Sequence, residues 1–182
     1  MIYNERTQRH EQVVASARQM LTAARTAPKA RGVDIIEAIL VEGDDLKLLA
    51  ERMVEIGNER NRPSFIRDAG NVLQAECVVV IGTKLQSLGL NCGHCGFATC
   101  AERENHHSQF LEVPCSLNSI DVGIAIGSAC ATAADLRLDT RVMYSIGVAA
   151  EQLGYLGSDV HLTMGIAISA SSKNPFFDRP VK

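Results

Sequence analysis

Four cysteines near the middle of the chain are the residues best suited to chemistry. Cys92, Cys95 and Cys100 have the spacing C-x2-C-x4-C, and Cys115 follows after fourteen intervening residues. Two thiolates in a C-x2-C pair can hold one metal ion or one metal cluster, because a tight turn points both side chains inward. We call residues 91–100 the cysteine loop and predict that it binds an iron–sulfur cluster.

The cysteine loop also contains residues that suit a tight turn around a charged cluster. Gly93 and Gly96 reach positive φ without a Cβ clash. We expect the amides of Gly93, Gly96 and Phe97 to donate hydrogen bonds to the sulfur atoms. A short helix expected over residues 98–105 would place partial positive charge beside a cluster that four thiolates leave net negative.

Zinc, a redox disulfide and a cubane cluster are the three interpretations of these thiols. Zinc commonly takes two C-x2-C pairs, or one pair with histidines, and His94, His106 and His107 are nearby. A redox C-x2-C pair leaves Cys100 and Cys115 without a role. A [4Fe–4S] cluster accounts for all four thiols. We favour the cluster, with a zinc-stapled structural or interaction domain as the alternative and a redox-switch thiol protein as the third reading.

The fourth ligand has two candidates among the remaining cysteines. Cys115 follows Pro114 in an expected loop, where the backbone can bring the sulfur to the cluster. Cys130 is the rival, but it lies in an alanine-rich helical segment in which small buried residues are common. Cys77 lies on an expected strand, where a buried small apolar role is the ordinary one. We therefore predict Cys115 as the ligand.

The composition restricts the class of protein and its partners. With 46% hydrophobic and 21% charged residues, the chain of 182 residues resembles a globular domain. A net charge of −3 without a long basic run argues against nucleic acid or an anionic membrane as partner. The amino-terminal segment lacks the apolar core of a signal peptide, and no apolar run approaches the roughly 20 residues that span a bilayer. Clustered cysteines in such a chain indicate metal ligands in a reducing cytoplasm.

The spacing of apolar residues predicts helices and a few strands in irregular alternation. Helices are expected over residues 5–26, from Asp44 or Asp45 to about 57, 64–74 with a break near Gly70, 98–105, 117–136 and 140–153. Strands are expected over residues 35–41, 75–82 and 160–168, the last half-buried, with residues 122–126 as a possible further strand. The fold class is α+β, as a single domain over 1–182 with a cluster-binding segment over 90–116.

The carboxyl-terminal residues 169–182 have no helix or strand pattern but contain Phe176 and Phe177. Two phenyl rings in an extended tail need an apolar surface, and burying each contributes roughly 1.5–3 kcal/mol. Either the body of the chain or a second subunit can provide that surface. We predict a homodimer in which this tail crosses, or lies beside, the subunit interface.

The cysteine spacing and four further stretches are similar to known families. LNCGHCGFATC resembles the four-cysteine motif of electron-transfer and corrinoid iron–sulfur proteins of anaerobes, with a slightly shorter spacer before the fourth cysteine. Nearly the whole chain resembles the prokaryotic ferredoxin-domain-containing family of unknown function, through AARTAPKARGVD (23–34), SFIRDAGNVLQA (64–75), LDTRVMYSIGVAA (138–150) and GIAISASSKNPFFDR (165–179). This resemblance implies a cluster-binding protein without an established substrate.

AARTAPKARG (23–32) and GYLGSDVHLTMGIAIS (154–169) are also similar to FMN-dependent nitroreductase-like proteins. That resemblance implies an α+β homodimer with flavin at the subunit interface, although the arginine-rich phosphate-binding start of that family is missing here. If a flavin or substrate binds, the polar residues expected to contact it are Arg31, Arg141, Lys173 and Asn174. The combined expectation is an electron-transfer protein or a component of a redox enzyme, acting with a redox partner protein or a small molecule.

Overall fold

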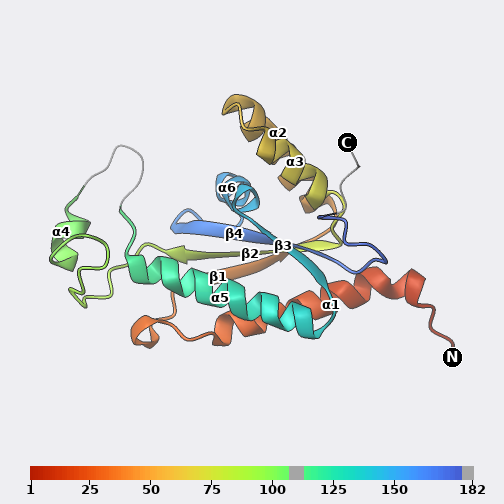
Figure 1. The fold of residues 1–182 in the computed structure, drawn as a ribbon, viewed down its shortest axis with the longest axis horizontal. Helices are drawn as coiled ribbons and strands as arrows, with labels where there is room; N and C mark the ends of the chain where they lie inside the picture. Colours follow the sequence, from red (N-terminus) through yellow and green to blue (C-terminus); the bar gives the residue numbers. More distant parts are fainter. Residues whose placement is uncertain (107–112, 178–182) are drawn as a thin grey trace.

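A four-stranded antiparallel sheet forms the centre of the molecule (Figure 1). The computed structural model describes residues 1–106 and 113–177. In spatial order the strands are β1 (Ile36–Val41), β2 (Cys77–Lys84), β4 (Val160–Ser169) and β3 (Asp139–Met143). The helical elements are α1 (Glu5–Thr26), the 3-10 turn η1 (Ala30–Gly32), α2 (Asp44–Glu59), α3 (Pro63–Val72), α4 (Cys100–Glu104), α5 (Ser116–Asp135) and α6 (Tyr144–Gln152). The predicted α+β class is confirmed.

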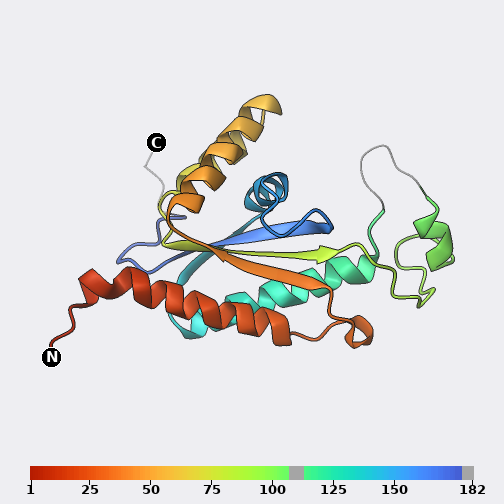
Figure 2. The same cartoon turned by 180° about the vertical axis from the view of Figure 1, so that it is seen from behind.

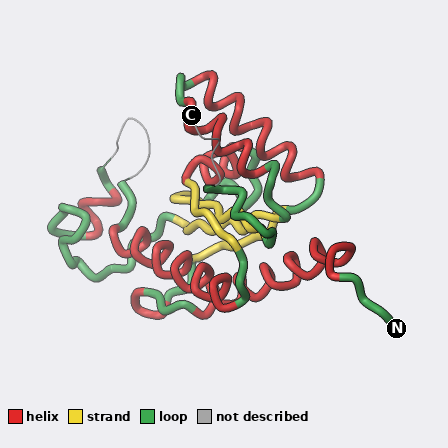
Figure 3. The backbone as a smooth tube through the Cα atoms, turned by 45° about the vertical axis from the view of Figure 1, so that its right-hand side comes forward, coloured by secondary structure: helices red, strands yellow, loops and turns green. Residues whose placement is uncertain are grey.

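Helices cover both faces of the sheet (Figures 1 and 2). Helices α1 and α5 lie on one face, and α2, α3 and α6 lie on the other, so the sheet forms the middle layer, as the yellow strands of Figure 3 show. Val78 and Val80 of β2 belong to the core under α2, α3 and α6. Cys77, Val79 and Ile81 belong to the core under α1 and α5. Successive side chains of a strand point to opposite faces, so β2 contributes to both cores.

The apolar run of β2 follows from this double coverage. Residues 77–83 are all buried, because β2 pairs with β1 on one edge and β4 on the other while helices cover both faces. A strand buried on both faces is nearly continuously hydrophobic. Residues 165–169 of β4 are buried in the same way, so the prediction of a half-buried strand was wrong for this part of it.

One predicted helix is wrong in its first four residues. Residues 140–143 belong to β3, and the helix α6 begins only at Tyr144. Thr140 pairs with Ile168, and Val142 pairs with Ile166. Pairing with β4 therefore determines the structure here, and the helical spacing of the apolar residues does not. Thr and Val are β-branched and suit a pleated surface better than a helix.

Helix boundaries account for most of the other differences. Helix α3 continues through Gly70 without the predicted break. Gly43, at φ 65°, is the N-cap of α2 in place of Asp44 or Asp45. Helix α5 spans the stretch for which a strand was the alternative, and its N-cap is Cys115. Helix α4 is shorter than predicted because Thr99 caps it and accepts a hydrogen bond from the Glu102 amide at 3.2 Å.

Helix α5 is also long and apolar enough to cross a membrane by length and composition, with a mean hydropathy of 1.3 over 18 residues. This departs from the expectation that no apolar run reaches such a length. One side of the helix packs in the core through Val122, Ala125, Ala129 and Ala133, and α1 lies alongside it. The apolar composition of that side is therefore explained by packing within the chain.

Helix α6 rests on β4 at a distance that only glycine permits. A Cβ on Gly147 would lie 1.9 Å from the carbonyl oxygen of Thr163, and a Cβ on Gly165 would lie 2.0 Å from Cγ2 of Ile146. The first of these contacts is with backbone, which cannot move aside without disturbing the sheet. The two glycines therefore set the spacing of α6 from β4.

We expect Gly147→Ala to lower the free energy of unfolding by about 2–4 kcal/mol, because the added methyl group overpacks this contact. The measurement is urea unfolding followed by circular dichroism. Gly70→Ala is the matched control, since nothing lies within 4 Å of its Cβ position in α3. The control should be neutral or stabilising by up to about 1 kcal/mol. Equal stability of the two variants would contradict this account of the packing.

Candidate functional site

The segment between β2 and α5 extends from one end of the molecule and contains the cysteine loop and α4 (Figures 1 and 2). Its base is held closed, because the Gln86 amide donates to Oδ1 of Asn118 at 3.3 Å. Gln86 follows β2, and Asn118 lies in the first turn of α5. The chain therefore leaves the body of the protein and returns to it at neighbouring points. We call the segment that follows β2 and the segment that precedes α5 the two arms of the site.

All four predicted cluster ligands line one cavity, which we call the cysteine cavity. Cys92, Cys95, Cys100 and Cys115 are all among its lining residues. Cys100 is the first residue of α4, and Cys115 is the buried N-cap of α5. The structure thus brings the three clustered cysteines together with the remote one.

The two other cysteines lie elsewhere and are poorly suited to ligation. Cys77 is fully buried in β2, and burial raises the pKa of its thiol to about 12. Cys130 packs beside the core between α5 and the sheet, and burial raises the pKa of its thiol as well. A thiol whose pKa is raised remains protonated, whereas the thiolate is the metal-binding form.

Asn91 organises the turn of the cysteine loop. Its backbone is left-handed, with φ 46°, and its amide donates to Sγ of Cys100 at 3.4 Å. Its side-chain oxygen accepts a hydrogen bond from the Cys100 amide at 2.8 Å. Asn91 is not among the predicted site residues, although asparagine commonly adopts left-handed conformations and bonds to nearby backbone. The predicted donor Gly96 instead donates to the carbonyl oxygen of Gly93 at 2.9 Å.

Hydrogen bonds favour the thiolate of Cys100. The Asn91 amide is the largest influence, and the Ser87 hydroxyl and the amides of Gly89 and Leu90 add to it. Together they hold the pKa of the Cys100 thiol below its usual range despite some desolvation. Donors aimed at a sulfur stabilise its charged form, which is the form that binds iron or zinc.

Arg103 joins the two arms of the site. Its Nη1 donates to the carbonyl oxygen of Val113 at 2.6 Å, and its Nη2 donates to Oγ of Ser87 at 3.0 Å. The residue is buried and lines the cysteine cavity. It is not among the predicted site residues either, because an arginine within the polar stretch Ala-Glu-Arg-Glu looks like an ordinary exposed helix residue.

The histidines near the cysteine loop make contacts of their own. Within residues 1–106 and 113–177, no three His, Cys, Asp or Glu side chains are arranged to hold one metal ion. His94 interacts through Nδ1 with the carbonyl oxygen of Cys92 at 3.1 Å, and the His106 ring packs on Phe97. His107 lies outside the described residues.

The size of the cysteine cavity bears on how a cluster would enter. The cavity measures about 10 Å³, roughly the space of one water molecule. Cys92 is exposed, and Cys95 and Cys100 are partly exposed. The cysteine loop therefore has to widen around a cluster, and its position at the surface allows this without disturbing the core.

The polar residues expected to contact a flavin do not meet in one place within the described chain. Nη1 of Arg141 donates to the carbonyl oxygen of Phe176 at 2.8 Å, and its guanidinium carbon lies 5.2 Å from the centre of the Phe177 ring. Nδ2 of Asn174 donates to Oδ1 of Asp139 at 3.1 Å. Arg141 and Asn174 thus hold the tail on the body.

The other two predicted flavin contacts are divided between the ends of the molecule. Arg31 lies in η1 with φ 58°, and its Nη1 donates to the carbonyl oxygen of Leu88 at 2.5 Å, next to the cysteine loop. Lys173 lies on the tail beside Asn174. Figure 1 shows η1 and the tail at opposite ends of the sheet. Phe176 is buried in the chain's own core, so this ring needs no partner subunit.

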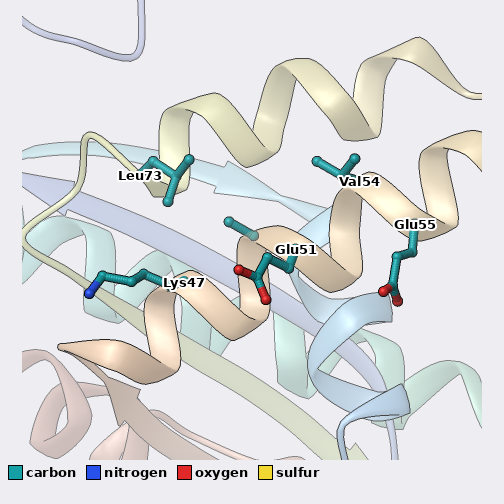
Figure 4. A pocket seen from close by; sticks show the side chains of 6 residues that line it. Lys47, Glu51, Val54, Glu55 and Leu73 are labelled. Carbon is teal, nitrogen blue, oxygen red and sulfur yellow. The ribbon is translucent and has the colours of Figure 1, made fainter.

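A further hollow of about 570 Å³ lies between α2 and Leu73 (Figure 4). Val54 and Leu73 supply its apolar surface, and Lys47, Glu51 and Glu55 are the charged residues that line it. The residues around it include no cysteine, histidine or hydroxyl group. Nothing in this set suggests chemistry.

The fold is similar to that of solved flavoenzymes. A nitroreductase with bound FMN from Desulfitobacterium hafniense matches over 95% of this chain and 80% of its own, with a TM-score of 0.58 and 15% identity. An oxidoreductase containing FMN matches over 87% and 67%, with a TM-score of 0.55 and 16% identity. Nitroreductase A from Vibrio parahaemolyticus matches over 92% of this chain but only 61% of its own, with a TM-score of 0.55 and 14% identity. At such identities the likeness establishes a nitroreductase-like fold.

Sequence comparison identifies the family. A protein of Archaeoglobus fulgidus, described as an uncharacterized protein, is 40% identical over 186 residues that cover all of both chains. Residues 112–179 match the family described as uncharacterized proteins containing a ferredoxin domain. That match includes Cys115 and Cys130 but begins after the cysteine loop. The chain belongs to this family of ferredoxin-domain-containing proteins (DUF2148).

Proposed function

We propose that this chain binds one [4Fe–4S] cluster through Cys92, Cys95, Cys100 and Cys115 and transfers electrons with it. The observation that carries the proposal is that four cysteines from two separate segments line one cavity. The ferredoxin-domain family and the nitroreductase-like fold support a redox role. A cluster held by four thiolates supplies reversible one-electron transfer when bound.

The surrounding residues support this role by favouring thiolates. Cys100 already receives the hydrogen bonds that lower the pKa of its thiol. Cys115 precedes the first turn of the 20-residue helix α5, where free amide groups carry partial positive charge. The Cys100 sulfur is therefore favoured in its thiolate form before any metal arrives.

The position of the cysteine loop suits exchange with a partner. Cys92 is exposed at the end of the molecule that extends beyond the sheet. A cluster held there is separated from solvent by little protein, so a redox protein or a small molecule can approach it closely. All six cysteines are free, as a reducing cytoplasm requires.

FMN is a second cofactor that the fold supports, since a structural neighbour contains it. The residues expected to hold it are divided between η1 and the tail within one protomer. One protomer alone does not bring all four residues together, and no step of the proposed function involves FMN.

A homodimer is the assembly we propose, with the outer side of α5 as the interface. Ile120 and Ile124 are 47% and 38% exposed there. Gly123, Gly127 and Ala131 lie between and beyond them and are exposed as well. The tail is the other candidate surface, because Phe177 is largely exposed while Phe176 is not.

We expect the anaerobically purified protein to be brown and to contain about four iron and four sulfide per chain. Iron, sulfide and zinc analysis of the same sample is the measurement. Stoichiometric zinc without iron, from iron-replete anaerobic cells, would overturn the proposal in favour of a zinc-stapled domain. Fluorescence of the supernatant after denaturation reports any bound flavin independently.

Cys115→Ser should strip the cluster or convert it to a three-iron form, because the cysteine cavity loses its remote thiolate. Cys130→Ser and Cys77→Ser are the controls and should retain the full iron content, since neither residue lines that cavity. Iron content and electron paramagnetic resonance (EPR) of the reconstituted proteins distinguish the cases. Loss of the cluster in Cys130→Ser with retention in Cys115→Ser would reverse the assignment.

For the assembly, Ile124→Glu should convert the dimer to a monomer in sedimentation velocity at tens of micromolar, because it places a charge in the middle of the α5 surface. Phe177→Ser should leave the dimer intact. The reverse pattern would assign the interface to the tail instead. A monomeric wild-type protein under these conditions would refute the dimer altogether.

A further inference from the structure

Arg103 is a buried cation at the cysteine cavity, and the described residues compensate its charge poorly. Its side chain is 2% exposed, and the nearest carboxylate among residues 1–106 and 113–177 is Oε1 of Glu104 at 3.7 Å, on a side chain that is 53% exposed. An exposed carboxylate at that distance compensates a buried charge poorly. Within the described part of the chain, the desolvated guanidinium therefore has little negative charge close to it.

The hydrogen bonds of Arg103 leave one donor open. Nη1 and Nη2 are used by Val113 and Ser87, but Nε is buried and has no partner among the described residues. Burying an N–H without an acceptor is unfavourable because the group loses its hydrogen bonds to water, so such groups are rare. Arg103 and the four cysteines line the same cavity. An acceptor for Nε is therefore to be sought in what that cavity holds.

We propose that Arg103 is a positioning residue for the cluster: its Nε–H donates to a sulfur in the cysteine cavity, and its charge raises the reduction potential. This inference rests on the proposed function. A [4Fe–4S] core with four thiolates is an anion, and one electron taken from an added reductant makes it more negative by one charge. Arg103 keeps its proton throughout and is neither oxidised nor reduced. A fixed cation stabilises the more negative state more strongly, which favours reduction.

A redox titration of the reconstituted full-length protein, followed by EPR, tests the charge. Arg103→Gln should lower the equilibrium constant for reduction at least tenfold, which is about 59 mV for one electron. Arg103→Lys keeps the charge and should give a smaller shift. Arg31→Gln is the matched control, because Arg31 donates to Leu88 near the loop but is exposed and does not line the cavity. An unchanged potential in Arg103→Gln would overturn the inference.

A second measurement decides the matter if the Arg103 variants fail to hold a cluster. Pulsed EPR of wild-type protein labelled with ¹⁵N-arginine should detect a weak nitrogen coupling to the reduced cluster, and Arg31→Gln should retain it. Absence of the coupling in wild type would refute the hydrogen bond. Failure of the proposed function looks different, because the wild-type protein would then contain no iron or sulfide.

Discussion

Burial of β2 and β4 on both faces is the constraint on which the rest of the structure depends. These two strands pair with each other along most of their length and contribute residues to both cores. With both faces covered, a slip of either strand would exchange its side chains between the two packed cores and misfit both. The end of β2 and the start of α5 are therefore held in place. The cysteine loop follows the first and Cys115 precedes the second, so the packing of the sheet and α5 limits the distance between them.

The candidate site combines a rigid base with an adaptable outer part. Cys115 is buried at the start of a helix that packs against α1, whereas Cys92 lies in an exposed loop. Arg103 connects the two parts through hydrogen bonds to Val113 and Ser87, while Asn91 closes the turn of the cysteine loop through hydrogen bonds with Cys100. One of the four cysteines is thus fixed in the body of the protein, and the other three lie in a segment with more freedom to move.

Local patterns predicted the long elements well, because their apolar spacing reflects the layer they pack against. The helix over residues 5–26 has the predicted bounds, and the apolar run before Gly82 is the central strand. Residues 140–143 were predicted wrongly as helix because their strand depends on pairing with Ile166 and Ile168, which are distant in sequence, whereas the helix that follows was predicted correctly. The convergence of the four cysteines followed from their spacing and chemistry. Arg103 could not be predicted, since burial of a helix arginine depends on the three-dimensional position of Val113 and Ser87.

The hydrogen bond between Gln86 and Asn118 has a consequence for the evolution and engineering of this fold. It joins the entry and exit of the cysteine segment at the surface of the layered body, so the segment meets the host at a narrow neck. Closing a loop at its neck confines the entropic cost of ordering it to the loop itself. Changes in the part of this segment that lies outside the neck are therefore expected to leave the packing of the sheet and its helices intact.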